Sequence, residues 1–120
     1  MRALSVRQPW ASLLFNGKLI ETRTWPTKYR GPLLIVSSKR PANEGPAGVA
    51  LGVVQLVDCR PMVEADEAQA CCPVYPKAQA WVVEEPQAIQ PFPVQGKLGI
   101  YEVDVEESDL VFLDQGAAHA

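Results

Sequence analysis

The stretch "VALGVVQLVDC", residues 49–59, is nearly continuous in β-branched and aliphatic residues. Such a run is typical of a strand that is covered on both faces, so we expect it to form the backbone of the core. Gly52 lies within it and permits a bend or a bulge in the strand. The apolar run at residues 48–54 falls far short of the ~20 residues that a membrane-spanning helix needs, so we expect no transmembrane segment.

Shorter elements are predicted on both sides of this segment. Alternating or apolar runs predict further strands at residues 2–6, 18–25, 33–38, 79–84 and 98–105. Turn and stop signals predict short helices at about 9–16 and 64–71, and closely spaced prolines predict a loop at 84–96. No helix separates every pair of strands, as a parallel doubly wound sheet would require. We therefore predict a mostly β fold with short helices (α+β), in a mostly antiparallel, partly closed β-barrel of about five to six strands.

The composition is that of one globular domain. The chain has 120 residues, of which 48 % are hydrophobic and 21 % are charged. We expect a domain at residues 1–106 and a partly disordered tail at 107–120. The N-terminus lacks the pattern of a secretory signal, so a cytoplasmic location is expected. Three cysteines and the single His119 fit neither a disulfide framework nor a zinc pattern, so we expect no metal and no cofactor.

Charge is divided unevenly along the chain. The first forty residues hold eight basic residues against Glu21 alone, whereas residues 41–120 hold three basic residues against thirteen acids. The net charge is −3. A basic cluster on an acidic protein indicates a local site for an anionic ligand, although the two halves can instead neutralise each other across the fold.

The stretch "GKLIETRTW", residues 17–25, has no clean apolar face. Period-2 alternation places Leu19, Glu21, Arg23 and Trp25 on one side of a strand, with Lys18 at its start. A plain structural strand rarely carries a carboxylate, a guanidinium and an indole on one face. The alternative is that Glu21 and Arg23 form only an exposed ion pair, worth at most about 1 kcal/mol.

Four stretches in this order and spacing resemble the ASCH domain family, whose members have a PUA-like β-barrel: "LSVRQPWASLL" (4–14), "KLIETRTW" (18–25), "YRGPLLIVSSKR" (29–40) and "AWVVEEPQAIQPFPVQGKLGIY" (80–101). The chain looks like a small single-domain member of bacterial or phage type. Lys18, Glu21 and Arg23 match the family's K-x-x-E-x-R pattern, which lines the cleft of the barrel. Asn16 stands in the usual place of the glycine, and Val36 stands where relatives often have histidine.

The resemblance implies RNA or nucleotide recognition. One branch of similar proteins hydrolyses the acetyl amide of N4-acetylcytidine with a lysine, a threonine three residues later and a distant glutamate. Lys18 matches that lysine, but Glu21 occupies the place of the threonine nucleophile. If the chain is an enzyme, we expect Lys18 to act as base or nucleophile and Glu21 as the proton carrier, with Glu84 or Glu85 as further candidates.

The candidate site combines charge with flat side chains. Paired to Glu21, Arg23 can direct its remaining donors to a phosphate or a base edge, and Lys18 adds a mobile positive charge. Trp10 and Trp25 offer surfaces for base stacking, although Trp10 can instead be core, as we expect of Trp81. The predicted ligand-binding residues are Arg7, Trp10, Lys18, Glu21, Arg23, Trp25, Tyr29, Ser38 and Lys39.

Three functions remain open at this stage. The first is a module that binds RNA or a nucleotide. The second is a small hydrolase with a modified nucleoside as substrate, and the third is an interaction domain whose basic half meets an acidic protein. The sequence does not give the oligomeric state.

Overall fold

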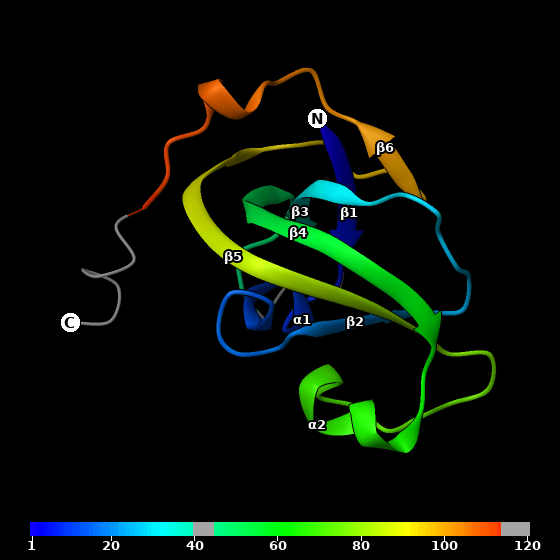
Figure 1. The fold of residues 1–120 in the computed structure, drawn as a ribbon. Helices are drawn as coiled ribbons and strands as arrows, with labels where there is room; N and C mark the ends of the chain where they lie inside the picture. The colour runs from blue at the N-terminus through cyan, green and yellow to red at the C-terminus, as the bar shows by residue number, and fades with distance from the viewer. Residues whose placement is uncertain (40–44, 114–120) are drawn as a thin grey trace.

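One curled sheet of six strands forms the body of the molecule. The structure, a computed structural model, describes residues 1–39 and 45–113. The strands follow the order β2-β5-β4-β3-β1-β6 across the sheet. Their bounds are β1 Arg2–Val6, β2 Ile20–Arg23, β3 Gly31–Ser37, β4 Val49–Pro61, β5 Gln79–Pro93 and β6 Ile100–Glu102. Figure 1 shows the long strands β4 and β5 curling together, so that the sheet forms a half-barrel. The predicted fold class is therefore confirmed.

The sheet is mixed, because β1 runs parallel to β3 and antiparallel to β6. The remaining neighbours pair antiparallel. In the parallel pair Val6 lies opposite Ser37, so β1 and β3 end at the same edge of the sheet. The residues that follow these two ends, Arg7 and Ser38, are thereby brought to one place.

The predicted loop at residues 84–96 is wrong, because β5 continues to Pro93. Its pairing with β4 jumps from Glu84 to Gln87 and again from Ala88 to Phe92. Pro86 and Pro91 fall inside these two jumps, where a residue without an N–H removes no bond from the ladder. The prolines therefore bend the strand and do not end it. The predicted bulge at Gly52 is confirmed, since the register of β4 shifts there.

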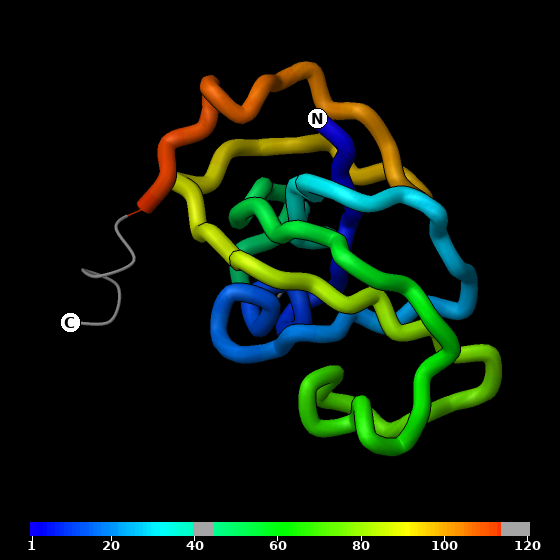
Figure 2. Tube along the Cα trace, viewed as in Figure 1, coloured from blue at the N-terminus to red at the C-terminus, as the bar shows by residue number. Residues whose placement is uncertain are grey.

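The helices are short. The first, α1 (Trp10–Leu13), lies within the range predicted for it, and residues 14–17 continue it as turns. The second predicted helix is divided into η1 (Glu64–Asp66) and α2 (Glu67–Ala70), and Cys71 ends it with a left-handed φ of 59°. Figure 2 shows this green segment projecting from the body of the sheet. Among the residues described, no helix has the length and apolar character needed to cross a membrane.

The core lies inside the curl of the sheet. Trp81 is fully buried, as predicted, together with the inward-facing side chains of β1, β3 and β4. A second cluster joins β3, β4 and β6 to Leu110. The N-terminal ammonium of Met1 donates to the carbonyls of Val103 and Val105 at 2.7 and 2.9 Å, which ties the start of the chain to the segment after β6.

Residues 100–113 end the described part of the chain. The strand predicted at 98–105 is shorter, covering Ile100–Glu102, and Leu98 lies outside it. A 3-10 turn, η2 (Glu107–Asp109), follows, and Phe112 forms a bridge to Ile89 of β5. The predicted tail lies in part at 114–120, outside the described residues, as do Arg40 and His119. The domain boundary at residue 106 stays a prediction.

Candidate functional site

A cleft of about 1110 Å³ opens at the edge of the sheet where β1 and β3 end. The ends of β1 and β3, the strand β2 and the connection between β5 and β6 all line it. Its charged lining residues are Arg7, Lys18, Glu21, Arg23, Lys39 and Lys97. Five cations thus surround one carboxylate, although the whole chain has a net charge of −3.

Glu21 lies at the floor of the cleft between two cations. Its side chain is only 9 % exposed, and its carboxylate oxygens lie 3.7 Å from Lys18 Nζ and 3.1 Å from Arg23 Nη2. β2 positions this carboxylate through its pairing with β5, in which Glu21 is opposite Trp81. A buried carboxylate is tolerated only when it is paired, and here both of its oxygens are. The alternative of an exposed ion pair is therefore wrong.

Lys18 is buried and held in place. Its side chain is 1 % exposed, and Nζ donates a short hydrogen bond to the carbonyl of Ala70, the last residue of α2. The backbone N–H of Lys18 donates to Leu13, which joins it to the end of α1. The predicted mobile charge is therefore wrong, because the ammonium is fixed between a helix end and Glu21.

Arg23 is fixed on one side of its guanidinium by two hydrogen bonds and by the ion pair with Glu21. Nε donates to Glu21 Oε2 at 3.1 Å, and Nη2 donates to the carbonyl of Ser5 at 2.7 Å. Within the residues that the structure describes, no hydrogen bond is recorded for Nη1, and the side chain is 24 % exposed. The planar group is thus oriented by the protein with donors left over for a ligand.

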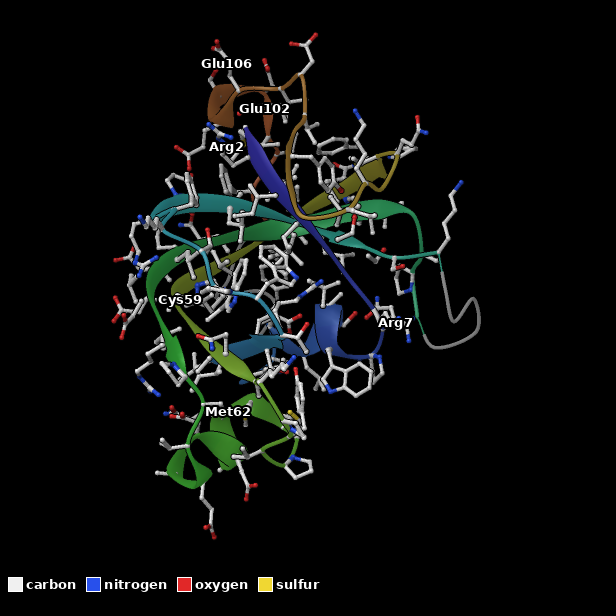
Figure 3. The ribbon with its side chains drawn as sticks, turned by 90° about the vertical axis from the view of Figure 1, so that its right-hand side faces the viewer. Arg2, Arg7, Cys59, Met62, Glu102 and Glu106 are labelled. Atoms are coloured by element: carbon white, nitrogen blue, oxygen red, sulfur yellow. The ribbon has the colours of Figure 1, made fainter. Side chains whose placement is uncertain are left out.

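Three exposed cations stand around the mouth of the cleft. Arg7 follows β1, Lys39 follows β3, and Lys97 lies between β5 and β6. Figure 3 shows Arg7 at one end of β1, with Arg2 and Glu102 at the other. The stem of Lys39 lies across Gly48, where a Cβ would come within 3.0 Å of Lys39 Cε. A larger residue at position 48 would displace the Lys39 side chain slightly, and the positive φ of 69° at this position also favours glycine.

The aromatic residues divide into buried and accessible ones. Trp25 packs edge-on against Trp81, with ring centroids 4.7 Å apart, and its carbonyl accepts the indole N–H of Trp81 at 3.2 Å. Trp25 is thus tied to the core, although it also lines the cleft. Trp10 is 38 % exposed and lines the same cleft, so the alternative that it belongs to the core is wrong.

Eight of the nine residues predicted to bind a ligand line this cleft. Ser38 does so at the end of β3, where its N–H donates to the carbonyl of Val6 at 2.8 Å. Tyr29 lies elsewhere, in a smaller hollow with Arg2 and Glu102, and its hydroxyl donates to the carbonyl of Pro32. Burial raises the pKa of Tyr29, while Arg2 acts in the opposite direction. Glu84 and Glu85 are exposed and do not line the cleft.

Sequence reasoning missed several lining residues. Lys97 and Leu98 belong to the acidic half of the chain, and Leu98 begins the strand expected at 98–105, so no local pattern marked either residue as part of a site. Thr22 and Cys72 meet in the cleft, with Oγ1 and Sγ 3.8 Å apart. Tyr75, which follows α2 in the chain, lines the cleft as well.

Two buried polar groups support the cleft from outside. Gln8 is fully buried and joins α1 to the segment before β4, because it donates to Ser12 and to the carbonyl of Pro46 at 2.9 Å each. Asp66 accepts two hydrogen bonds from Arg60, at 2.7 and 2.9 Å, and one from the N–H of Val63. The hydrogen bonds from Arg60 and then that from Val63 lower the pKa of Asp66 to about 2.

The sequence and the fold agree with one family of known proteins. The model of the ASCH domain matches residues 4–93, which is most of the chain. The chain belongs to the ASCH domain family. The predicted family is therefore confirmed, and the K-x-x-E-x-R residues of this ASCH domain form the floor of its cleft.

Two mammalian proteins share sequence similarity with this ASCH domain. Activating signal cointegrator 1 of Mus musculus is 31 % identical over 127 aligned positions, which cover 84 % of this chain and 22 % of that protein. Activating signal cointegrator 1 of Homo sapiens is 39 % identical over 80 positions, which cover 47 % of this chain and 14 % of that protein. The chain thus spans about a fifth of the length of these relatives or less.

Solved structures confirm the fold. The crystal structure of ASCH from Zymomonas mobilis superposes with a TM-score of 0.67 at 16 % identity, over 90 % of each chain. A single-substitution variant of the same bacterial protein superposes with a TM-score of 0.63 at 15 % identity, over 90 % of this chain and 93 % of that one. At these identities the likeness establishes the fold alone.

Proposed function

We propose that this ASCH domain binds RNA or a nucleotide in the cleft at the end of β1 and β3. The observation that carries the proposal is the fixed floor of Lys18, Glu21 and Arg23 beneath a mouth of exposed cations. A floor held by buried ion pairs does not need to reorganise when a ligand enters. Preorganisation of this kind lowers the cost of binding.

The charge of the cleft favours an anionic ligand. Five cations and one carboxylate line it, and Arg7, Lys39 and Lys97 are exposed at its mouth. Converging charge of one sign raises the local concentration of oppositely charged ligands. Phosphate groups meet this requirement, because lysine and arginine both donate to phosphate oxygens.

The floor adds selectivity to this attraction. Among the residues that the structure describes, none accepts a hydrogen bond from Arg23 Nη1, while Glu21 and the carbonyl of Ser5 hold the plane of the guanidinium. A guanidinium that is fixed in this way can donate from Nη1, in a set direction, to a phosphate oxygen or to an acceptor on the edge of a base. The exposed indole of Trp10 supplies a stacking surface nearby, worth about 1–3 kcal/mol per base.

A salt titration tests the proposal. Binding of a fluorescent single-stranded RNA is measured by anisotropy at increasing salt, for wild type and for the Arg7→Ala and Lys39→Ala variants. Each lost phosphate contact is expected to weaken binding and to reduce the slope of log K against log salt by about 0.7. Lys28→Ala is the matched control, because Lys28 is exposed and lies outside the cleft. Absence of RNA binding, or binding that does not depend on salt, contradicts the proposal.

A hydrolase is the second candidate, and one observation favours it. Lys18 and Glu21 place an ammonium and a carboxylate 3.7 Å apart at the floor of the cleft. Hydrolysis of N4-acetylcytidine with water releases acetate and cytidine, so turnover is measured directly on the free nucleoside. We expect Lys18→Ala to abolish any such turnover. Turnover retained in that variant removes Lys18 from the chemistry.

A further inference from the structure

We infer that Gln8 is a positioning residue of the cleft. Its buried side-chain amide sets the distance between α1, which carries Trp10, and the segment 45–48, against which Lys39 lies. The inference rests on the proposed function, because the position of Lys39 affects binding only if a ligand enters the cleft. Gln8 itself does not line the cleft, so it acts through the residues that it holds.

The amide of Gln8 is hydrogen-bonded on two sides. Toward α1, Oε1 accepts from the backbone N–H of Ser12 at 3.0 Å, and Nε2 donates to Ser12 Oγ at 2.9 Å. Toward the segment 45–48, Nε2 donates to the carbonyl of Pro46 at 2.9 Å. A primary amide has two N–H donors, so both bonds from Nε2 form together. One buried amide thus joins two segments that are 38 residues apart in the chain.

The segment 45–48 carries this constraint to Lys39. Gly45 lies against the amide of Gln8, where a Cβ would come within 3.2 Å of Nε2. At the other end of the segment, the stem of Lys39 lies along Gly48, with Cγ only 3.2 Å from the place of a Cβ. A shift of this segment therefore moves the surface on which the Lys39 stem rests.

The same segment supports the connection between β5 and β6. The carbonyl of Gly48 accepts a hydrogen bond from the N–H of Val94 at 3.1 Å, at the start of the connection that brings Lys97 to the cleft. Gln8 is thus linked through one short segment to two of the three cations at the mouth, Lys39 and Lys97. Side chains that are held in place before a ligand arrives bind it at a lower cost.

A double-mutant cycle tests the inference, with binding of a fluorescent single-stranded uridine octamer as the readout. Gln8→Met keeps the length of the side chain and removes its hydrogen bonds, and we expect it to weaken binding at least about threefold. In a Lys39→Ala background, the same substitution is expected to weaken binding less than about twofold, because the side chain that Gln8 positions is gone. In a Lys28→Ala background the full effect is expected to remain, since Lys28 is exposed outside the cleft.

Asn16→Ala is the matched control. The amide of Asn16 donates to the carbonyl of Ser12 at 2.9 Å, so it also holds α1, but from the other end of the helix. This variant is expected to bind the octamer within about twofold of wild type. Melting temperature is measured for every variant, and binding is measured where each variant is folded. If Gln8→Met does not fold, Gln8→Asn replaces it, because its amide is one methylene shorter and is expected not to reach both partners.

Three outcomes contradict the inference. Equal losses from Gln8→Met in the Lys39→Ala and Lys28→Ala backgrounds give Gln8 a general structural role and overturn it. Binding of the octamer by Gln8→Met as tightly as by wild type also overturns it, and the proposed function then stands. If wild type binds no octamer, the proposed function fails and the inference fails with it.

Discussion

Glu21 is the residue on which the floor of the cleft depends. It is the buried counter-charge of both Lys18 and Arg23. Glu21→Gln keeps the size of the side chain and removes its charge. The buried Lys18 ammonium then keeps its hydrogen bond to the carbonyl of Ala70 but loses its counter-charge. Removal of one partner from a buried ion pair is expected to lower the free energy of unfolding by about 3–5 kcal/mol, measured by urea denaturation.

The control for this prediction is another paired glutamate on the surface. Glu102 lies 3.0 Å from Arg2, but its side chain is 64 % exposed. Glu102→Gln is expected to cost less than about 1 kcal/mol, because water screens such pairs. Equal losses in the two variants contradict the structural role given to Glu21.

The sequence predicted many of the residues that line the cleft. The alternation of residues 21–25 places Glu21, Arg23 and Trp25 on one face, and this holds because β2 is regular from Ile20 to Arg23. The burial of these charges could not be predicted from one strand, because α2, with its Ala70 carbonyl, covers Lys18 from another part of the chain. Leu98 was missed because no local pattern marks a residue of the connection between β5 and β6 as part of the cleft.

The η1–α2 segment is the element that covers Lys18, and Asp66 holds it. The hydrogen bonds from Arg60 keep the pKa of Asp66 at about 2, against an ordinary value of 3.8. A lowered carboxyl pKa stabilises the folded state fully above about pH 4, and this contribution is lost as pH falls through about 2. The stability difference between wild type and Asp66→Asn is therefore expected to shrink on acidification.

Urea midpoints of both proteins at about pH 6 and about pH 2.5 measure this difference. Wild type is expected to be the more stable protein at the higher pH and to lose most of its advantage at the lower pH. A difference that stays constant across the two values contradicts the assignment of the stabilisation to the Asp66 carboxylate.

The bulge in β4 is the second element with a sharp requirement. A Cβ at Gly52 would lie 2.4 Å from Phe15 Cε1 and 2.5 Å from the carbonyl oxygen of Gln87, which belongs to the neighbouring strand. Gly52→Ala is expected to lower the free energy of unfolding by at least about 1–3 kcal/mol, measured by thermal or urea denaturation. Val57→Ala, on the exposed part of β4, is the comparison. A stable Gly52→Ala variant contradicts the close approach.

Two prolines were the main obstacle to predicting the extent of the strands. Pro86 and Pro91 ordinarily end a strand, and only the register of β4 against β5 shows that both fall where the ladder is interrupted. The presence of a strand could be predicted from an apolar run such as residues 49–59. The length of a strand could not be predicted, because it depends on the partner strand and not on local propensity.

For the whole molecule, ligand binding is expected to raise the melting temperature. A ligand that binds only the folded state adds about 2.7 kcal/mol at a concentration of 100 Kd. For a domain of this size, this free energy corresponds to an increase of about 10 °C in the melting temperature, which is measured with a single-stranded uridine octamer. The Arg7→Ala and Lys39→Ala variants, assayed at the same concentration, are expected to show smaller increases. An octamer that leaves the wild-type melting temperature unchanged contradicts RNA as the ligand.

The architecture as a whole was predictable, because absent helices between strands exclude a doubly wound sheet. The parallel pairing of β1 with β3 was not expected from the sequence, yet it is what brings Arg7, Ser38 and Lys39 together. The fold also accounts for the uneven distribution of charge along the chain. Basic residues from separate segments meet in one cleft and are not all neutralised across the fold.

Site-resolved NMR shows directly whether the ligand binds in this cleft. The three tryptophans provide three indole N–H signals, of which Trp10 belongs to the exposed wall and Trp81 to the core. On titration with a single-stranded uridine octamer, the signals of the Trp10 indole N–H and of the backbone amides of Lys39 and Lys97 are expected to shift most. The signal of the Phe112 backbone amide is expected to stay unchanged. Shifts that cluster away from the cleft, or the absence of any shift, would contradict ligand binding in this cleft.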